Sequence, residues 1–346
     1  MTQMRPADHK DFELTDAPGE TGPFDDVRAL IAQPAGPAHE YGQKVYEALL
    51  GMGREGDYGK LGDGAAWLAA WQKRYPPRIE MPTLAVFAGS HGVTEGGVSL
   101  SSIESTRKRV DALREGQAPL SAIAAQVGAN IRVFELAIEK PTPNIAETAA
   151  MSERECAANI AFGFEALEGK PDAIALGVLG AGIGSAAAAV SLAQYGGSAD
   201  YWVRPGPQVP NEMGQARVEV VEQALKTHRG HLEDPLQALR CLGGRELAAC
   251  VGTIIAARQQ GVPIIIDGFA TTIAAGVVHA INPLALDHVR AAHVTRRPAH
   301  QAALERLGLS PLVDLEFNTG GGMGSCAAIG LLKTACSPFL GQPLDS

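Results

Sequence analysis

Short apolar runs alternate along most of the chain with longer stretches that carry an apolar residue every three or four positions. The runs have the length of buried strands, and the longer stretches have the spacing of amphipathic helices. We expect strands at residues 83–88, 131–138, 173–179, 263–267, 289–294 and 312–317. We expect helices at residues 103–115, 152–167, 185–195, 212–227, 245–260, 299–307 and 324–335. This alternation predicts an α/β fold with an open, mostly parallel sheet that carries helices on both faces.

The first part of the chain has a different pattern. Residues 38–50 and 63–74 read as helices, and no strand pattern precedes residue 78. Trp67, Leu68 and Trp71 lie at helical spacing and are expected to pack in a core. The domains predicted from these patterns are a small helical domain at residues 1–77, shared with the C-terminal end, an α/β nucleotide-binding domain at 78–336, and an extended tail at 337–346.

Composition and charge exclude several classes of protein. The net charge is −9 and the basic residues are scattered, which disfavours nucleic acid as a partner. The apolar runs are far shorter than the roughly 18–20 residues of a membrane span, so we expect no membrane partner. The first 20 residues are polar and resemble neither a secretory signal nor a transit peptide, which predicts a cytoplasmic protein. The five cysteines have no CxxC spacing, which predicts reduced, mostly buried thiols rather than a zinc site or disulfides.

Two glycine-rich turns follow predicted strands, at residues 179–185 and 318–325. Ligands of open parallel sheets lie at the carboxyl ends of the strands, and free N–H groups at a helix N-terminus bind anions such as phosphate. The plain alternative is that these glycines only make tight turns. A dinucleotide site fits poorly, because Ser185 occupies the third glycine position and Asp200 precedes the next strand-like run.

Further polar groups follow other predicted strands. A polar group at one strand end is more often a cap or a satisfied buried group than a catalytic one, but a shared position at several strand ends favours a site. The residues concerned are Ser90, His91, Asp267, His293 and Thr295.

The ordered set of turns resembles the family of nicotinate-nucleotide:dimethylbenzimidazole phosphoribosyltransferases, which make the lower-ligand nucleotide of cobalamin. The resemblance covers the chain from about Gly59 to Ala335. Each motif is short, and it is their order and spacing that carry the resemblance. The matching segments are 59–62 with 66–69, 86–93 with 95–99, 182–184, 243–248, 266–269 and 308–312.

The resemblance implies a parallel α/β domain, a small domain built from both chain ends, and a homodimer. It implies a reaction in which a benzimidazole nitrogen displaces nicotinate from nicotinate mononucleotide, with a small-molecule nucleotide and a heterocyclic base as partners and with no cofactor or metal. Positions that match phosphate- or nucleotide-binding places are Gly182, Ile183, Gly184, Arg217, Thr295, Asn318, Gly320 and Gly322. Candidates for the base pocket are Ser90, Ser99, His293 and Met323.

Five polar positions depart from the family pattern. Gly321 stands where the family has a glutamate proposed as the catalytic base, and Gly180 stands where it has a second glutamate. The remaining departures are Asn318 for an arginine, Ser90 for an aspartate and Arg297 for a glutamate. Loss of a positioned general base typically lowers a rate by about 100- to 10,000-fold, so the two glycines bear directly on activity.

Three hypotheses follow from these departures. The first is a divergent phosphoribosyltransferase, a pentosyltransferase in which His91, Asp267 or Glu316 takes over proton transfer. The second is a catalytically altered or inactive paralogue that binds a nucleotide or base as a sensor, a carrier or a partner of an active enzyme. The third is an enzyme with a different anionic substrate, favoured by the added glycines and by Arg297.

Overall fold

A six-stranded parallel sheet forms the centre of the protein in the computed structural model, which describes residues 22–204 and 209–341. The strand order is β2-β1-β3-β4-β5-β6, and every neighbouring pair is parallel. The strands are β1 (Pro82–Ser90), β2 (Asn130–Glu135), β3 (Ala173–Ala181), β4 (Ile264–Ile266), β5 (Val289–His293) and β6 (Pro311–Val313). The predicted α/β class and parallel sheet are therefore confirmed.

Helices form at all of the predicted places. They are α2 (His39–Gly51), α3 (Gly59–Gln72), α4 (Ile103–Arg114), α6 (Glu153–Phe162), α7 (Ile183–Tyr195), α9 (Asn211–Thr227), α11 (Arg245–Gln260), α13 (Pro298–Arg306) and α14 (Met323–Cys336). The pattern did not predict α1 (Asp25–Ala32), α5 (Pro119–Gln126), α8 (Ala199–Val203), α10 (Pro235–Leu242) or α12 (Gly268–Ile281). The short 3-10 helices are η1 (Gly92–Gly96), η2 (Gly163–Leu167), η3 (Pro283–Leu286) and η4 (Ser337–Phe339).

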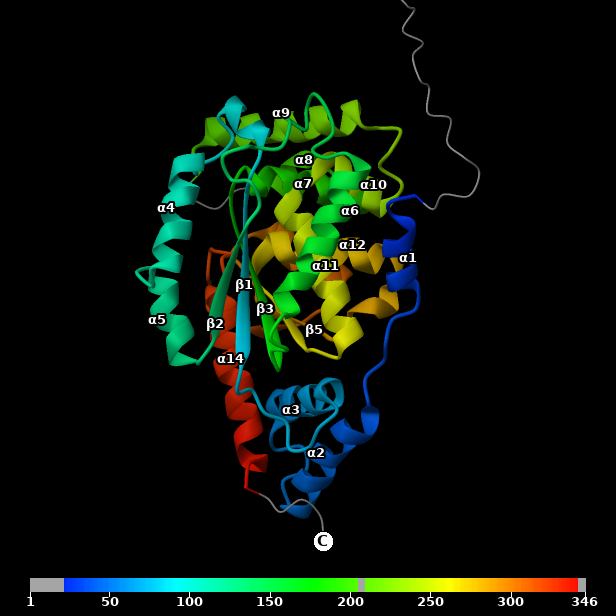
Figure 1. The fold of residues 1–346 in the computed structure, drawn as a ribbon, viewed down its shortest axis with the longest axis vertical. Coiled ribbons are helices and arrows are strands. Elements are labelled where there is room, and N and C mark those ends of the chain that lie inside the picture. Colours follow the sequence, from blue (N-terminus) through cyan, green and yellow to red (C-terminus); the bar gives the residue numbers. More distant parts are fainter. Residues whose placement is uncertain (1–21, 205–208, 342–346) are drawn as a thin grey trace, which may run out of the picture.

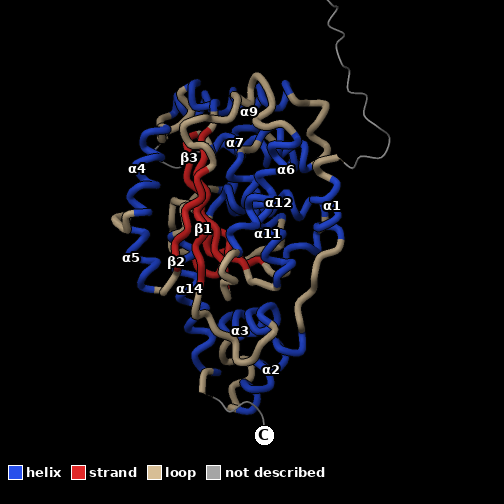
Figure 2. The backbone as a smooth tube through the Cα atoms, in the orientation of Figure 1, coloured by secondary structure: helices blue, strands red, loops and turns tan. Residues whose placement is uncertain are grey.

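Successive side chains of the central strands enter two separate cores, one on each face of the sheet. Leu84 and Val86 of β1 pack in one core with α5 and α14, whereas Ala85 and Phe87 pack in the other with α6, α7, α11 and α12. This alternation is the period of two that a strand imposes on its side chains. Figures 1 and 2 show the resulting layers, with the sheet between α4, α5 and α14 on one side and α6, α11 and α12 on the other.

A small helical part lies beyond the N-terminal ends of the strands, where α2 and α3 meet the end of α14 (Figure 1). Its core joins Val45 and Leu49 of α2 with Ala69 of α3 and with Phe339 of the C-terminal turn. The tail predicted as extended therefore begins instead with a 3-10 turn, because the fully buried Phe339 ties it to this core. Residues 342–346 of that tail, and the N-terminal segment used to argue for the cytoplasm, lie outside the described residues.

Trp67 and Trp71 connect the small helical part to the sheet. Both indole nitrogens donate hydrogen bonds to the backbone carbonyl of Asp287, at 3.0 and 3.2 Å, just before β5 begins. The predicted packing of these residues in a core is confirmed, since both side chains are buried with Leu84 and Ile265. Helix α1 departs from the predicted grouping, because its Val27 and Ile31 pack in the core of the α/β part. The boundary at residue 77 stays a prediction.

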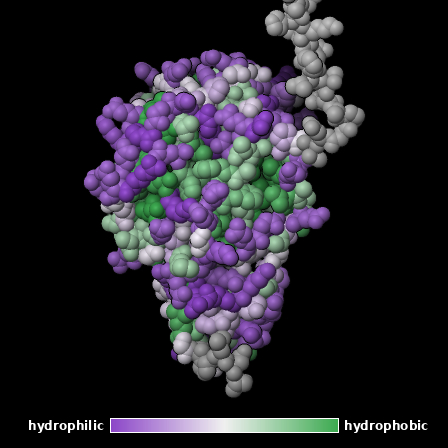
Figure 3. All heavy atoms as spheres, in the orientation of Figure 1, coloured by the Kyte–Doolittle hydropathy of each residue, from purple (hydrophilic) through white to green (hydrophobic). Residues whose placement is uncertain are grey.

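The visible face of the molecule is hydrophobic mainly across the middle of the α/β part, whereas the end formed by the small helical part is mostly hydrophilic (Figure 3). In the part of the chain that the structure describes, no helix combines the length and the apolar character that crossing a membrane requires. All five cysteines are free and buried, as predicted.

His288 makes the stability of the fold depend on pH. Its ring is fully buried, its Nε2 donates to the Ile254 carbonyl at 2.8 Å, and burial lowers its pKa from 6.5 to about 3. The unfolded chain takes up a proton near pH 6.5, so this stabilisation is present above that pH and is lost as the pH falls. When the pH falls from 7 to 5, protonation of this ring in the unfolded chain should therefore lower the free energy of unfolding by about 2 kcal/mol.

Urea unfolding of the protein and of His288→Gln at pH 5, 6 and 7 checks this expectation. The glutamine amide can still donate to the Ile254 carbonyl but does not titrate, so the variant should lose less stability between pH 7 and pH 5 than the parent does. Equal losses in the two proteins would show that His288 is not the group that takes up the proton.

Candidate active site

The order of the strands places the switch point of the sheet between β1 and β3. The chain leaves β1 toward β2 on one side and then places β3 on the other side, and such switch points hold the ligands of open parallel sheets. The two strands end in register, with Ser90 opposite Ala181. His91 and the Gly182 turn therefore follow neighbouring strand ends. The sequence predicted that each of them follows a strand.

Gly182 turns the chain from β3 into α7. Its φ is +88°, in the left-handed region that favours glycine, and a Cβ there would come within 2.9 Å of the Cβ of His91. The Ser99 hydroxyl accepts a hydrogen bond from the Gly182 N–H at 3.2 Å. No acidic residue lies in the first turn of α7, so its partial positive charge is available to an anion.

A pocket of about 170 Å3 opens beside this helix end, and we call it the arginine pocket. Two turns, two strand ends and the start of α12 surround it. Its lining is Val178, Ile183, Gly184, Phe269, Ala270, Thr295, Arg297, Asn318, Thr319 and Gly320. Five of the predicted phosphate- or nucleotide-binding residues thus come together, namely Ile183, Gly184, Thr295, Asn318 and Gly320. Their binding of phosphate stays a prediction.

Arg297 gives this pocket its charge. Its guanidinium lies 4.4 Å from the centroid of the Phe269 ring and donates to the Val203 carbonyl at 3.1 Å. Burial and then the nearby positive charge of Arg217 lower the pKa of Arg297 to about 10, which still leaves it charged at neutral pH. Arg217 itself donates to the Val98 carbonyl at 2.6 Å. Two cations held this close favour the binding of an anion between them.

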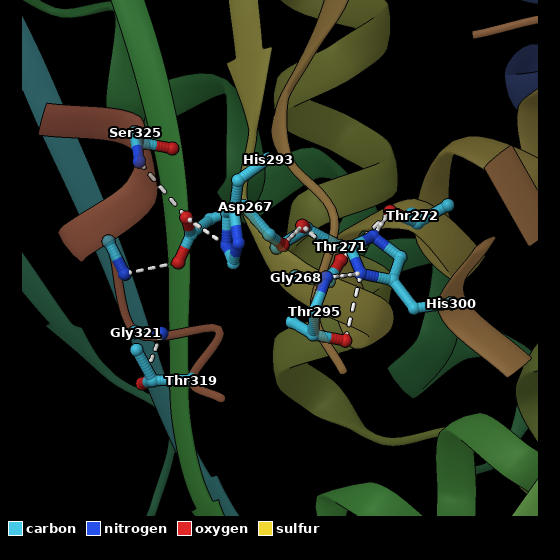
Figure 4. A network of polar contacts seen from close by, with 11 residues as sticks. Asp267, Gly268, Thr271, Thr272, His293, Thr295, His300, Thr319, Gly321 and Ser325 are labelled. Atoms are coloured by element: carbon cyan, nitrogen blue, oxygen red, sulfur yellow. Dashed lines mark hydrogen bonds and ion pairs between the residues drawn. The ribbon is translucent and has the colours of Figure 1, made fainter. Parts of the chain in front are cut away.

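His300 holds Thr295 at the edge of the arginine pocket. The Thr295 N–H donates to Nδ1 of His300 at 3.0 Å, and Nε2 of the same ring lies 3.0 Å from the Thr272 hydroxyl (Figure 4). Burial, then His293 and Arg297, lower the pKa of His300 to about 3, so the ring is neutral and its Nδ1 can accept. Nothing in the sequence indicated this role, because Thr295 and His300 meet only through the turn before α13.

Asp267 fixes the second glycine-rich turn. One carboxylate oxygen accepts from the Gly322 N–H at 2.6 Å, and the other accepts from the Ser325 N–H at 3.0 Å (Figure 4). Nε2 of His293 lies 3.0 Å from the second oxygen, although the ring is not oriented for a hydrogen bond. Asp267 and His293 are both fully buried, so the structure places them behind the turn rather than in a pocket wall.

His91 pairs with a carboxylate that the sequence analysis did not single out. Its Nε2 lies 2.6 Å from Oε1 of Glu246, at the start of α11, and both side chains are fully buried. Burial raises the pKa of Glu246, but the attraction and hydrogen bond of His91 outweigh burial and leave that pKa lowered. The sequence feature that could have indicated this pair is the glutamate in the first turn of a largely apolar helix.

The other predicted side chains lie apart from the arginine pocket. The buried Ser90 hydroxyl donates to the Ile138 carbonyl at 2.5 Å. Glu316 was predicted within a strand, but β6 ends at Val313, and Glu316 lies exposed in the following loop with φ +53°, paired with Arg296. The proton-transfer roles of His91, Asp267 and Glu316 stay predictions.

A second pocket, of about 390 Å3, lies on the other side of the second glycine-rich turn, and we call it the apolar pocket. It is formed by α4, the start of α5, the end of β3 and the turn before α14. Its lining is Lys108, Arg109, Ala112, Leu113, Gln117, Ala118, Pro119, Leu120, Leu179, Thr319, Gly321 and Met323. Of the residues predicted for the base pocket, Met323 is in the lining of the apolar pocket, and Ser90, Ser99 and His293 are not. Thr319 lines both pockets, so they are neighbours.

Larger hollows, of about 570 and 670 Å3, lie at the opposite ends of the strands, the first beside Arg290 near the start of β5 and the second beside Pro82 at the start of β1. Ligands of parallel sheets bind at the carboxyl ends, where a pocket of about 500 Å3 lined by Ser99 also lies. We assign the site to the arginine and apolar pockets because residues of the second glycine-rich turn line both of them. Within the described ranges, no group of three His, Cys, Asp or Glu side chains is arranged to hold a metal ion.

The two glycines that replace the family's glutamates differ in the space around them. A Cβ on Gly321 would meet the Leu179 side chain at 3.5 Å and nothing closer, so a side chain fits there. A Cβ on Gly180 would lie 2.8 Å from the backbone carbonyl oxygen of Gly89. Gly180 therefore allows the ends of β1 and β3 to pair closely, whereas Gly321 leaves space in the wall of the apolar pocket.

This difference predicts unequal costs for the two alanine variants. Gly180→Ala should lower the free energy of unfolding by about 1–3 kcal/mol, because the strands must separate to admit the methyl group. Gly321→Ala should stay within about 0.5 kcal/mol of the parent. Urea unfolding of both variants measures the two costs, and equal stabilities would contradict the close approach at Gly180.

Comparison with known proteins identifies the family of this chain. Residues 49–340 match a family described as phosphoribosyltransferase. The chain is 43% identical to a nicotinate-nucleotide–dimethylbenzimidazole phosphoribosyltransferase of Sinorhizobium fredii, covering 91% of this chain and 93% of that protein. It is 41% identical to the protein of the same name from Brucella canis, covering 90% and 93%.

A solved structure agrees with these relatives. The crystal structure of CobT from Thermus thermophilus superposes with a TM-score of 0.74 at 29% identity, over 91% of this chain and 95% of that one. The family match spans all six strands and both glycine-rich turns, so the predicted resemblance is confirmed. The chain belongs to the nicotinate-nucleotide:dimethylbenzimidazole phosphoribosyltransferase family.

Proposed function

We propose that this protein transfers the phosphoribosyl group of nicotinate mononucleotide to an aromatic base, as the names of its relatives indicate for those proteins. In this reaction the bond from C1′ of the ribose to the nicotinate nitrogen breaks, and a bond from the base to C1′ forms. The observation that carries the proposal is the arginine pocket, where Arg297 and the N-terminus of α7 offer a site for one phosphate.

The arginine pocket would hold the phosphate of the nucleotide. The amides of the first turn of α7 and the Thr295 hydroxyl can donate to the phosphate oxygens, while Arg297 supplies a full positive charge nearby. A bound dianion would also relieve the repulsion between Arg297 and Arg217. These groups are held in advance by Phe269, Val98 and His300, so little reorganisation accompanies binding.

The apolar pocket would hold the base. Leu113, Leu120 and Met323 offer the apolar surface that an aromatic ring needs, and Thr319 lies where the two pockets meet. A nucleotide in one pocket and a base in the other would therefore approach each other across the second glycine-rich turn. Held in this way, the reacting atoms gain the advantage of proximity, which is a large part of catalysis in group transfer.

We further propose that the protein acts in the cytoplasm as a homodimer, as the resemblance implies. The five free and buried cysteines support a reducing compartment. Size-exclusion chromatography with light scattering measures the oligomeric state directly.

An assay with nicotinate mononucleotide and 5,6-dimethylbenzimidazole tests the function, with nicotinate and the ribotide product measured by mass. We expect release of nicotinate in step with formation of the ribotide. Arg297→Gln should raise the KM for the nucleotide by about 10- to 100-fold, because it removes a charge-assisted contact to the phosphate. Arg154→Gln, which removes an exposed cation from α6, serves as the matched control and should keep the parental KM.

Two results would contradict this proposal. If the nucleotide bound but no acceptor gave nicotinate, the protein would be a binding paralogue without transferase activity. If Arg297→Gln and Arg154→Gln gave the same KM, the arginine pocket would not hold the phosphate. Melting temperatures of both variants separate a loss of contact from a loss of folding.

A further inference from the structure

We propose that the apolar pocket takes an acceptor that reacts as an aromatic anion, such as an acidic azole that has lost its N–H proton. This inference rests on the proposed function and names the class of its second substrate. Two independent features carry it, namely the lack of a proton acceptor in the pocket walls and an unneutralised cation at the pocket rim.

The walls of both pockets, as far as the described residues form them, lack a group that could take a proton at neutral pH. Among the described residues that line them, none is Asp, Glu or His. Gly321 lines the apolar pocket at the position where the family has its proposed base. The two residues predicted to accept a proton already have other partners. Asp267 accepts two backbone N–H groups, and His91 is buried in contact with Glu246.

The chemistry of the acceptor decides whether such a base is needed. A neutral benzimidazole attacks C1′ with the lone pair of one nitrogen, and the other nitrogen must then lose its proton. An anionic acceptor attacks with an electron pair and has no proton to lose. In both cases nicotinate leaves with the electron pair of the broken C1′–N bond, so the anionic reaction balances without a base on the protein.

Arg109 is the unneutralised cation. Helix α4 carries four basic residues, and three of them pair with carboxylates: Arg107 with Glu135, Lys108 with Glu104, and Arg114 with Glu135. Arg109 instead donates to the Ser101 hydroxyl at 2.5 Å and to the Ser105 carbonyl at 3.2 Å. Within the described part of the chain no carboxylate lies within ion-pair distance of it, so its charge is available to a ligand in the apolar pocket.

The position of Arg109 suits an acceptor that is aromatic as well as anionic. It lies one turn before Leu113 on α4, and both residues line the pocket, with Leu120 and Met323 on the other walls. Apolar walls lower the local dielectric and so strengthen the attraction between the guanidinium and an anion. A neutral ring would gain only the apolar contacts.

A matched pair of acceptors tests this inference. The compound 5,6-dimethylbenzotriazole has nearly the shape of 5,6-dimethylbenzimidazole but a far more acidic N–H. We expect kcat/KM for the triazole to exceed that for the benzimidazole by at least about 100-fold, the usual effect of a missing base, and to rise with pH as the triazole ionises. A preference for the benzimidazole at every pH would overturn the inference.

Variants connect the preference to the residues named. Gly321→Glu, for which the pocket has room, should move the preference back toward the benzimidazole. Arg109→Gln should weaken binding of the ionised triazole by about two- to fivefold, as expected for a rim charge, whereas Arg154→Gln should not. Equal affinities in the two arginine variants would show that Arg109 does not hold the acceptor.

Calorimetric binding separates this inference from the proposed function. If neither acceptor releases nicotinate, the transferase proposal fails, and the affinities of the two acceptors still decide what the pocket recognises. Binding of the triazole that tightens as it ionises, and that depends on Arg109, supports an anion-binding apolar pocket. Binding that ignores ionisation overturns it.

Discussion

The carboxylate of Asp267 holds the site together. It leaves the end of β4 and accepts the N–H groups of Gly322 and Ser325, which lie more than fifty positions later in the chain. A buried carboxylate that lacked these two donors would be costly, so the bonds fix the path of the second glycine-rich turn. That turn passes over the end of β3, where the Gly320 carbonyl accepts from the Val178 N–H at 3.1 Å. The two pockets exist because this turn lies between them.

The charges at this end of the sheet are arranged in two opposite ways. Arg297 and Arg217 stand near the start of α7 with no acid in its first turn, although each cation alone would disfavour the other. His91 and Glu246, by contrast, pair with each other inside the protein, where both are fully buried. The buried pair lies beside the end of β1, next to Gly89, while the two arginines keep their charge for a ligand. The same end of the sheet thus contains a buried His–Glu contact and two arginines whose charge is available to a ligand.

The sequence predicted the strands and most helices because apolar runs and helical spacing are local properties. It did not predict α12, because this helix is buried on nearly every side and therefore shows no helical alternation of apolar and polar residues. The resemblance to the family placed five residues near one ligand, and the structure brings them together at the carboxyl ends of the strands, namely Ile183, Gly184, Thr295, Asn318 and Gly320. The sequence could not show that His91 meets Glu246, since that contact depends on how α11 packs against the distant strand β1. Nor could it show that His300 holds Thr295, since that contact depends on the path of the turn before α13.

The two glycines at positions where the resemblance implies glutamates look alike in the sequence and differ in the structure. At Gly321 a side chain can be restored by one substitution, because the pocket beside it is open. At Gly180 the backbone of β1 has closed onto the position, so a side chain there requires the strands to move as well. Placing carboxylates at the two positions would therefore have unequal costs: Gly321 has room for a side chain as it stands, whereas at Gly180 the ends of β1 and β3 must first separate.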